Sequence, residues 1–433
     1  MASPSKPYSL AIVGGGISGL VLAIALLEQG IKPTIYEAAQ HFSEIGAGVA
    51  LGPNAVRAMS MMSPKIEDAF NICKTHNLSP GMENTWFTIR IGDARKAGKD
   101  GFVKPGVKIG DAWFDVKFSK NENRGGVYRA HFLDELVKHV PDEIAHFGKK
   151  LVDVGEADNG DVILNFADGS TAQHTAVIGC DGIKSRTRAI VLGQGDPATK
   201  AVFSGKYAYR GLIPMDEAVE LVGEEEAKNS QMYFGYHGHV LTFPVQKGKT
   251  MNVVAFASSE EWKDEKWVVT TSKQDMVDDF AEWGPTVKAI INAMQKPDIW
   301  ALFYHPPART YYKDRICLVG DAAHATTPHQ GAGAGMCIED AAILSAVLKE
   351  ANDIEGLKKA FAAYDEVRRP RTQKNVVTSK EAGMLYDFEL EGDDLDKIEE
   401  NDRNRMYWIW DEDLDAEVEQ ARKLYFGEKS SKI

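Results

Sequence analysis

The glycine-rich segment Gly14-Gly15-Gly16-Ile17-Ser18-Gly19 constrains the fold of this chain more than any other feature of the sequence. It matches the pattern G-x-G-x-x-G. The apolar run YSLAIV precedes it, and LVLAIALLEQG follows it with the apolar spacing of a helix. A second apolar run, PTIYE, ends at Glu37. This order of strand, helix and strand predicts a β-α-β unit.

The residues of this unit point to a dinucleotide ligand. Gly14 permits a tight turn, and Gly16 lets a pyrophosphate approach backbone N–H groups at the start of a helix. Gly19 permits close packing of the helix on the strand. Glu37 stands eighteen residues after Gly19, where a carboxylate accepts hydrogen bonds from a ribose. The motif therefore predicts dinucleotide binding, and it leaves NAD and FAD open.

Composition and charge limit the class of protein. With 433 residues, 44% of them hydrophobic and 26% charged, the chain has the profile of a globular protein with two or three structural units. Its net charge of −13 argues against general attraction to nucleic acid or to an anionic membrane. It has no apolar run of about 18 residues, which a transmembrane helix needs. We expect neither nucleic acid nor membrane as a partner, and we leave monomer and homodimer open.

The pattern of strands and helices changes along the chain. Aromatic, β-rich segments such as KYAYRGLIPM and QMYFGYHGHVLTFPV follow the first unit, RICLVGDAAH is typical of a buried strand that returns to it, and the rest is mainly helical. We expect Pro370 to end or kink a helix, because proline lacks a backbone donor. The predicted fold class is α/β, with a Rossmann-like dinucleotide-binding domain in two parts (8–188 and 309–375), an inserted β-sheet substrate domain (189–308, with contributions from about 80–120) and a C-terminal helical segment and tail (376–433).

The segment GDAAHATTPHQGAGAG, residues 320–335, admits three interpretations. A metal site is disfavoured, because His324 and His329 are five residues apart with Pro328 between them and no companion carboxylate motif. A catalytic histidine pair is the second interpretation. The third is a cradle for a flat anionic group, since the alternating glycines lead into the helical pattern MCIEDAAILSAVLKEA. The N-terminus of such a helix offers unpaired N–H groups and about half a positive charge, which favours the cradle.

Three motifs occur in a fixed order along the chain. GGGISG with Glu37 comes first, Cys180-Asp181-Gly182 follows, and Gly320-Asp321 stands after the strand ICLV. In this order and spacing the chain resembles the single-component flavoprotein aromatic hydroxylases, the para-hydroxybenzoate hydroxylase fold family, over about residues 8–375. It is most similar to salicylate hydroxylase and its fungal relatives in the segments EIGAGVALGPNAVRAM, GVYRAHFLDELVKHVP, YAYRGLIP, GHVLTFPV, PHQGAGAG and MYWIWDEDLD.

This resemblance implies FAD as the bound cofactor and NADH or NADPH as a transient co-substrate, and it assigns roles to four residues. Glu37 would hold the adenosine ribose, and Arg129 would reach the ribityl-pyrophosphate region. Asp181 would lie near the pyrophosphate, and Asp321 would bind the ribityl chain. A surface salt bridge is the alternative for Arg129, and a simple turn is the alternative for each aspartate. The other FAD contacts that the resemblance implies are Gly14, Gly16, Ser18, Gly19, Gly48, Pro328, Gly333, Ala334 and Gly335.

The same resemblance implies a monooxygenase that uses O₂ and hydroxylates a phenolic acid through a C4a-hydroperoxyflavin. Salicylate, converted to catechol with loss of CO₂, is the expected substrate. The alternative is a phenol-dearomatising enzyme for a polyketide-derived phenol, because such fungal relatives also carry an arginine at the equivalent of YAYRG. A flavin-binding protein without catalysis is disfavoured by the intact segment PHQGAGAG.

Three residues are candidates for catalysis. Arg210 is the candidate anchor for a phenolate or carboxylate, because a guanidinium stays charged and binds in a bidentate manner; a buried ion pair is its alternative. His239 is a candidate for orienting or deprotonating a phenol, because histidine titrates near neutral pH; a core histidine is its alternative. His329 is expected to border the substrate cavity, whereas His324 packs or caps a turn. The candidate substrate contacts are Trp86, Phe87, Met232, Phe234, Phe243 and Pro328.

The two ends of the chain bear on its location. The N-terminal segment MASPSKPYS lacks the features of a secretory signal, which predicts an intracellular protein. The last three residues, Ser431-Lys432-Ile433, differ in one position from the peroxisomal signal S-K-L. The cytoplasm is therefore the expected location, with the peroxisome as the alternative.

Overall fold

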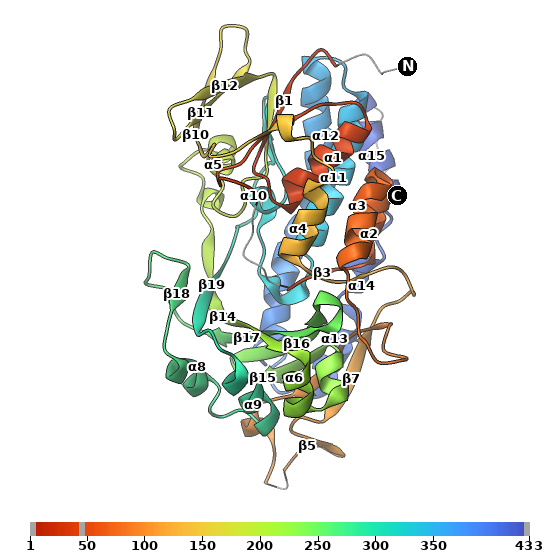
Figure 1. Cartoon of the computed structure of the whole chain (residues 1–433), viewed down its shortest axis with the longest axis vertical. Coiled ribbons are helices and arrows are strands. Elements are labelled where there is room, and N and C mark those ends of the chain that lie inside the picture. The colour runs from red at the N-terminus through yellow and green to blue at the C-terminus, as the bar shows by residue number, and fades with distance from the viewer. Residues whose placement is uncertain (1–5, 43–47, 100, 428–433) are drawn as a thin grey trace.

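The computed structural model describes residues 6–42, 48–99 and 101–427, and the terminal Ser431-Lys432-Ile433 lies outside these ranges. Figure 1 shows an elongated molecule, with a six-stranded sheet and long helices toward one end and an eight-stranded sheet toward the other. None of the described helices combines the length and the apolar character needed to cross a bilayer.

The six-stranded sheet contains the predicted β-α-β unit. β1 (Leu10–Val13) pairs in parallel with β2 (Thr34–Tyr36) and with β13 (Ala176–Gly179). All residues of β1 and β13 are buried, which explains why both segments are apolar without alternation. The spatial order of the strands is β20 (Tyr312–Lys313), β21 (Ile316–Leu318), β13, β1, β2 and β9 (Ala145–His146).

A group of helices packs beside this sheet. Apolar residues on all sides of α1 (Ile17–Glu28) make it a buried helix, and it packs against α11 (Gly333–Glu350). α1 starts shortly after the end of β1. The surrounding helices are α2 (Pro53–Met62), α3 (Pro64–Cys73), α4 (Arg129–Val137), α5 (Arg186–Leu192), α10 (Asp321–His324) and α15 (Leu414–Phe426).

Three small antiparallel sheets accompany these elements. The first, on the other side of β1 from the helices in Figure 1, consists of β10 (Leu151–Glu156), β11 (Val162–Phe166) and β12 (Thr171–His174). The other two are the pairs β3 (Gly48–Leu51) with β8 (Gly125–Tyr128) and β5 (Phe102–Lys104) with β6 (Val107–Lys108).

The eight-stranded sheet separates two layers of side chains. Along β17 (Thr250–Ser258), Met251, Val253 and Ala255 pack in one apolar cluster with the helices, whereas the alternate residues face the other side. The helices of that cluster are α6 (Met215–Val222), α7 (Glu224–Lys228), α8 (Lys273–Asp279) and α9 (Pro285–Ala293). The strand order is β18 (Val268–Thr270), β19 (Asp298–Tyr304), β14 (Val202–Pro214), β17, β16 (Gly238–Val245), β15 (Gln231–Gly235), β4 (Thr85–Ile91) and β7 (Ala112–Lys117).

The long helix α12 (Ile354–Tyr386) connects the two halves of the molecule, because it contacts both β20 and β16. Of the two expectations for Pro370, an end or a kink, the helix end is wrong, since α12 continues through the proline for sixteen more residues. The physical reason is tertiary. Arg368 and Arg371 stand on either side of the proline, and both pair with buried carboxylates of α11, while Arg368 also pairs with Glu417 of α15. Helices α13 (Leu395–Asn404) and α14 (Tyr407–Trp410) follow.

Candidate active site

One large cavity of about 960 Å³ is lined by residues from both major sheets. Gly14 after β1, Glu37 after β2 and Asp181 after β13 line one end of it, together with Asp321 after β21. These four residues follow the carboxyl ends of parallel strands, where α/β sheets bind their ligands. The motifs that are far apart in the sequence therefore meet in one site.

Two glycines of the first motif are required by close packing. Gly14 has a φ of +106°, and a Cβ atom on it would lie 2.3 Å from the carbonyl oxygen of Cys180. A Cβ atom on Gly19 would lie 2.1 Å from the carbonyl oxygen of Gly14. Helix α1 thus rests directly on the turn that ends β1. Gly19 does not line the cavity, so its effect on a ligand acts through Gly14.

The N-termini of two helices open into this cavity. α1 starts after Gly16 and α11 after Ala332, and neither helix has a side chain that caps its first N–H groups or an acidic residue in its first turn. Their partial positive charge is therefore available to an anion. Gly16 and Gly333 both line the cavity. This pair of uncapped helices fits a pyrophosphate at α1 and the anionic edge of a reduced flavin at α11, as FAD requires.

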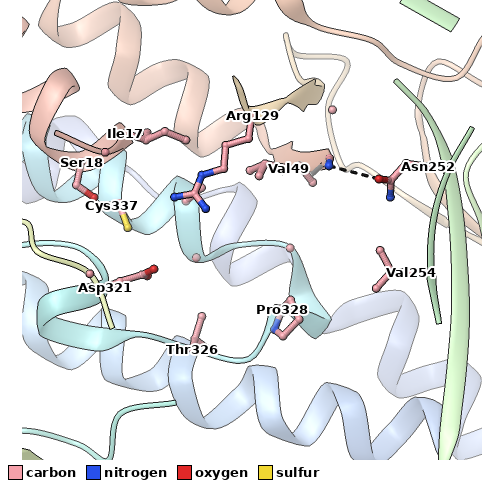
Figure 2. A pocket seen from close by; sticks show the side chains of 18 of the residues that line it. Ile17, Ser18, Val49, Arg129, Asn252, Val254, Asp321, Thr326, Pro328 and Cys337 are labelled. Atoms are coloured by element: carbon pink, nitrogen blue, oxygen red, sulfur yellow. Dashed lines mark hydrogen bonds between the residues drawn. The ribbon is translucent and has the colours of Figure 1, made fainter. Parts of the chain in front are cut away.

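Arg129 and Asp321 face this space from opposite sides. Arg129 opens α4, and Figure 2 shows its guanidinium extending toward Ser18 and Cys337. Asp321 points its carboxylate into the same space from the start of α10. A cation and a carboxylate at this place suit the phosphates and the ribityl hydroxyls of the cofactor, respectively.

The other two predicted carboxylates are held by the backbone around them. Glu37 accepts hydrogen bonds from the N–H groups of Gly15 at 2.6 Å and Ala39 at 2.7 Å. Asp181 accepts hydrogen bonds from the N–H groups of Arg186 at 2.7 Å and Thr187 at 3.0 Å, which begin helix α5. Both residues line the cavity, yet the Asp181 carboxylate serves chiefly as a cap.

Toward the eight-stranded sheet the cavity becomes apolar. Trp86, Met232, Phe243 and Pro328 line it as expected, and Phe87 does so too. Phe243 packs closely on the first residue of β3, because a Cβ atom on Gly48 would lie 2.6 Å from its ring. Asn252 on β17 accepts a hydrogen bond from the N–H group of Gly48 at 3.4 Å, drawn as the dashed line in Figure 2. Aromatic and apolar walls of this kind suit a planar ring and exclude water.

Arg210 is the cation of this apolar region. It is only partly buried, lines the cavity and stacks on the ring of Trp300 with 4.6 Å between its guanidinium carbon and the ring centroid. Burial, together with the nearby charge of Arg129, lowers the pKa of Arg210 to about 10, which leaves it charged at neutral pH. Among the described residues it has no carboxylate partner. The alternative of a buried ion pair is therefore wrong for the described part of the chain.

Two predicted site residues lie behind the wall of the cavity instead of lining it. His239 is fully buried, and its Nδ1 lies 2.7 Å from the carboxylate of Asp387. Phe234 is also fully buried and stacks on Tyr386 with 4.8 Å between ring centroids. Both belong to the sheet face that looks toward the cavity, but the end of α12 covers them. We correct both assignments: neither side chain reaches the substrate space.

The glycines of the segment 320–335 have different roles. Gly333 and Ala334 line the cavity as expected. Gly335 does not, because it is buried on another side of α11, where a Cβ atom would lie 3.3 Å from the side chain of Asn54. Its small size serves the packing of α11 on α2.

The two histidines of this segment turn to different partners. Nε2 of His324 lies 2.6 Å from the buried carboxylate of Asp340, whereas Nδ1 of His329 lies 3.3 Å from Nε2 of His239. His324 is therefore a packing residue, as expected. Within residues 6–42, 48–99 and 101–427, no group of three or more His, Cys, Asp or Glu side chains has the arrangement of a metal site.

Sequence reasoning missed several lining residues on the eight-stranded sheet. Asn252, Val254 and Phe256 on β17 and Trp300 on β19 line the cavity without belonging to any motif. The alternation of β17 carries a signal, since residues two apart share one face. The sequence does not show which element packs against each face of β17, so it does not show which face lines the cavity.

The fold and the cavity define a class of protein, the Rossmann-type flavoproteins whose dinucleotide site opens under a mainly antiparallel second sheet. A family model for an FAD binding domain matches residues 156–379, and one for an NAD(P)-binding Rossmann-like domain matches residues 12–50.

Similar proteins narrow this class. The chain is 43% identical to a 6-methylsalicylate 1-monooxygenase of Aspergillus terreus, over 97% of this chain and 93% of that protein. It is 39% identical to a salicylate hydroxylase of Pseudomonas putida, over 95% and 94% of the two chains. A solved salicylate hydroxylase substrate complex has a TM-score of 0.80 at 35% identity and covers 96% of this chain and 98% of its own. This chain belongs to the FAD-dependent monooxygenases of the salicylate hydroxylase type, which use FAD and NADH or NADPH.

Replacing Asp321 with alanine should weaken FAD binding. Its carboxylate faces the cavity and makes no hydrogen bond or ion pair with a described side chain, so its polar capacity is left for the cofactor. Loss of charge-assisted hydrogen bonds costs about 1.5–3 kcal/mol, which corresponds to a Kd for FAD raised about 10- to 100-fold. Flavin fluorescence on dilution measures this change.

His324→Ala is the matched control. It removes a side chain three residues away that contacts Asp340 and not the cavity. We expect a lower Tm, because Asp340 loses a buried partner, and an unchanged Kd for FAD. A variant at His324 that retains FAD but loses turnover would contradict its assignment as a packing residue.

Proposed function

We propose that this chain hydroxylates an ortho-hydroxybenzoate, either salicylate or a ring-methylated salicylate, at the carbon that bears the carboxylate. One oxygen atom enters the ring to give a catechol, CO₂ leaves, and the other oxygen atom becomes water. The observation that carries this proposal is the guanidinium of Arg210, which has no carboxylate partner among the described residues and lies in a mainly apolar, aromatic part of the cavity. A bidentate cation at that place suits a carboxylate next to a hydroxyl group.

FAD, when bound, takes electrons from NADH or NADPH and activates O₂ for transfer to the substrate. The residues of the chain have the tasks of binding, orientation and exclusion of water. Arg210 fixes the carboxylate end of the ring, while Phe243 and Pro328 limit its tilt. The apolar walls keep water from the reacting atoms, which protects reactive species from hydrolysis.

A second candidate function is hydroxylation of a larger, polyketide-derived phenol without loss of CO₂. The cavity continues past the aromatic residues to a polar end, which favours a substrate longer than a single ring. The residues that line this end are Thr75, His76, Asn77, Glu83, Arg124 and Ser230. A phenol with an oxygenated side chain would meet these groups.

A panel of phenols tests both candidates. Purified FAD-loaded protein is mixed with NADH or NADPH and with salicylate, 6-methylsalicylate, phenol or a bicyclic polyketide phenol, and coenzyme oxidation, CO₂ and product mass are measured. Release of CO₂ with a catechol product supports the first function. Gain of one oxygen atom without CO₂ supports the second. Oxidation of the coenzyme with every oxygen recovered as peroxide would rule out both.

A further inference from the structure

A chain of buried polar side chains starts at the wall of the active-site cavity. Nδ1 of His329 lies 3.3 Å from Nε2 of His239. Nδ1 of His239 lies 2.7 Å from one carboxylate oxygen of Asp387, and the other oxygen of Asp387 pairs with Lys206. The side chains of His239 and Asp387 are both 0% exposed. Charged groups are rare in a protein core, and those that are buried need partners such as these.

The chain continues outward to a second cavity of about 580 Å³. Lys206 pairs with Glu389 at 3.1 Å, and Glu389 pairs with His237 at 3.2 Å. All three line the second cavity. Their side chains are 7%, 28% and 68% exposed in that order, so exposure rises steadily along the chain. We call the six connected residues the relay: His329, His239, Asp387, Lys206, Glu389 and His237.

His329 stands between the two cavities. It lines both of them, and it directly follows Pro328, which Figure 2 shows in the main cavity. Its Nδ1 is engaged with His239, so Nε2 is the ring nitrogen left for a group in a cavity. The ring is packed against α12, because a Cβ atom on Gly383 would lie 2.7 Å from its Cδ2. His329 is therefore the fixed side chain that connects the relay to the main cavity.

We propose that the relay moves a proton between the substrate hydroxyl in the main cavity and water in the second cavity. This inference rests on the proposed function, in which the substrate is a phenol. A phenol donates more electron density to the attacking oxygen once its O–H bond has broken. His329 is then a catalytic residue. His239 and Asp387 are positioning residues that act through it.

The inner transfers can be written with every proton accounted for. The hydroxyl O–H bond breaks as an N–H bond forms at Nε2 of His329. His329 gives its Nδ1 proton to Nε2 of His239, and His239 gives its Nδ1 proton to Asp387. The ionised carboxylate of Asp387 can only accept hydrogen bonds, so His239 must carry its proton on Nδ1.

The outer transfers complete the path. As Asp387 takes its proton on the oxygen that faces His239, the ammonium group of Lys206 at the other oxygen releases one proton to Glu389, so that Asp387 and Lys206 become a neutral pair. Glu389 passes it to water in the second cavity or to His237. When the product hydroxyl forms, a proton returns along the same contacts and restores both histidine tautomers. No oxidant or further reactant is needed.

The surroundings of His329 favour this coupled transfer. Burial lowers its pKa well below the usual range, and the neighbouring His239, Lys206 and Arg405 lower the pKa further. His329 is therefore neutral before turnover. It accepts a proton at Nε2 as it passes its Nδ1 proton to His239, and the negative charge of Asp387 stabilises the positive charge that develops on the two rings.

The first test needs no substrate. Histidine ¹⁵N NMR of the FAD-loaded protein should show a proton on Nδ1 of His239 and on Nδ1 of His329. In Asp387→Asn, the ammonium group of Lys206 donates to the single amide oxygen, so the NH₂ group faces His239. An NH₂ group only donates, so His239 should then carry its proton on Nε2. A wild-type His239 with its proton on Nε2 would overturn the relay, whether or not salicylate is a substrate.

The second test is turnover with salicylate in H₂O and D₂O. We expect Asp387→Asn to lower kcat about 100-fold, which is within the range of general acid–base effects, with little change in KM. The solvent isotope effect on kcat should rise. Tyr386→Phe is the matched control, since its ring also packs on His239 with 5.2 Å between centroids but its hydroxyl is outside the relay. It should keep kcat and the isotope effect.

The two tests separate failure of the relay from failure of the proposed function. An Asp387→Asn variant that turns over salicylate at the wild-type rate overturns the relay and leaves the function standing. Absence of turnover in the wild-type protein overturns salicylate as substrate, and the tautomer of His239 still decides the relay. If Asp387→Asn does not fold, the wild-type spectrum decides it alone.

Discussion

Arg210→Gln is expected to raise the KM for salicylate about 10- to 100-fold, because loss of a charge-assisted hydrogen bond costs about 1.5–3 kcal/mol. The guanidinium has no carboxylate partner among the described residues, so its removal leaves no unpaired acid behind. The change should therefore appear in substrate binding and not in stability. Steady-state kinetics and the flavin absorbance change on substrate binding measure it.

Two controls make this result specific. Phenol lacks the carboxylate, so its affinity should be the same for the wild-type protein and for Arg210→Gln. Arg403→Gln removes another arginine that stacks on an aromatic ring, that of Phe114, outside the cavity, and it should leave the KM for salicylate unchanged. Equal losses for salicylate and phenol would show that Arg210 acts by packing on Trp300 and not by binding the carboxylate.

Gly14→Ala is expected to abolish FAD retention and to destabilise the protein by several kcal/mol. The new Cβ atom would lie 2.3 Å from the carbonyl oxygen of Cys180, so β1 and β13 cannot keep their spacing. The φ of +106° adds further strain, because side chains cost about 1–2 kcal/mol in left-handed conformations. The absorbance ratio of flavin to protein and thermal unfolding measure the two effects.

Gly169→Ala is the matched control for backbone strain. Gly169 also has a positive φ, +82°, but a Cβ atom on it would have nothing within 4 Å. It lies in the turn between β11 and β12, away from the cavity. We expect a loss of about 1 kcal/mol and full FAD retention. A Gly14→Ala protein that retains FAD like this control would contradict the close approach of the two strands.

The positively charged interior explains how an acidic protein binds anions. The net charge of −13 predicts repulsion of anionic ligands from the surface as a whole. Arg129 and Arg210 line the cavity, and two uncapped helix N-termini open into it. FAD, NADH or NADPH and the proposed carboxylated phenol are all anionic, so local cations favour their binding.

The dinucleotide part of the site was predictable because its contacts are local. Gly14, Gly16 and Glu37 lie within one strand-helix-strand unit, and their spacing fixes where each stands relative to the others. The segment around Asp321 was predictable for a related reason. It joins the end of one strand to the start of a helix, and that pattern repeats the logic of the first motif.

The substrate part was only partly predictable. The alternation of residues along β15 and β16 places Met232, Phe234, His239 and Phe243 on one face of the sheet. Met232 and Phe243 line the cavity, whereas Phe234 and His239 lie under the end of α12. A period of two assigns residues to a face but does not say which part of that face another element covers.

Strand β14 shows the same distinction. Lys206 and Arg210 are four residues apart on one face, and the sequence offers no reason to separate them. Arg210 opens to the cavity, while Lys206 is held by Asp387 and Glu389 from the chain after α12. The arginine lines the cavity and the lysine is buried in ion pairs because of a helix that ends more than 170 residues later.

The sequence by itself determined the dinucleotide fold and the anion-binding turns, because each depends on residues within one short unit. Only the tertiary structure decided which side chains face the substrate and which form the relay. His239 meets His329 across 90 residues and Asp387 across 148. Contacts at such separations arise from the packing of whole elements against one another, and no local spacing encodes them.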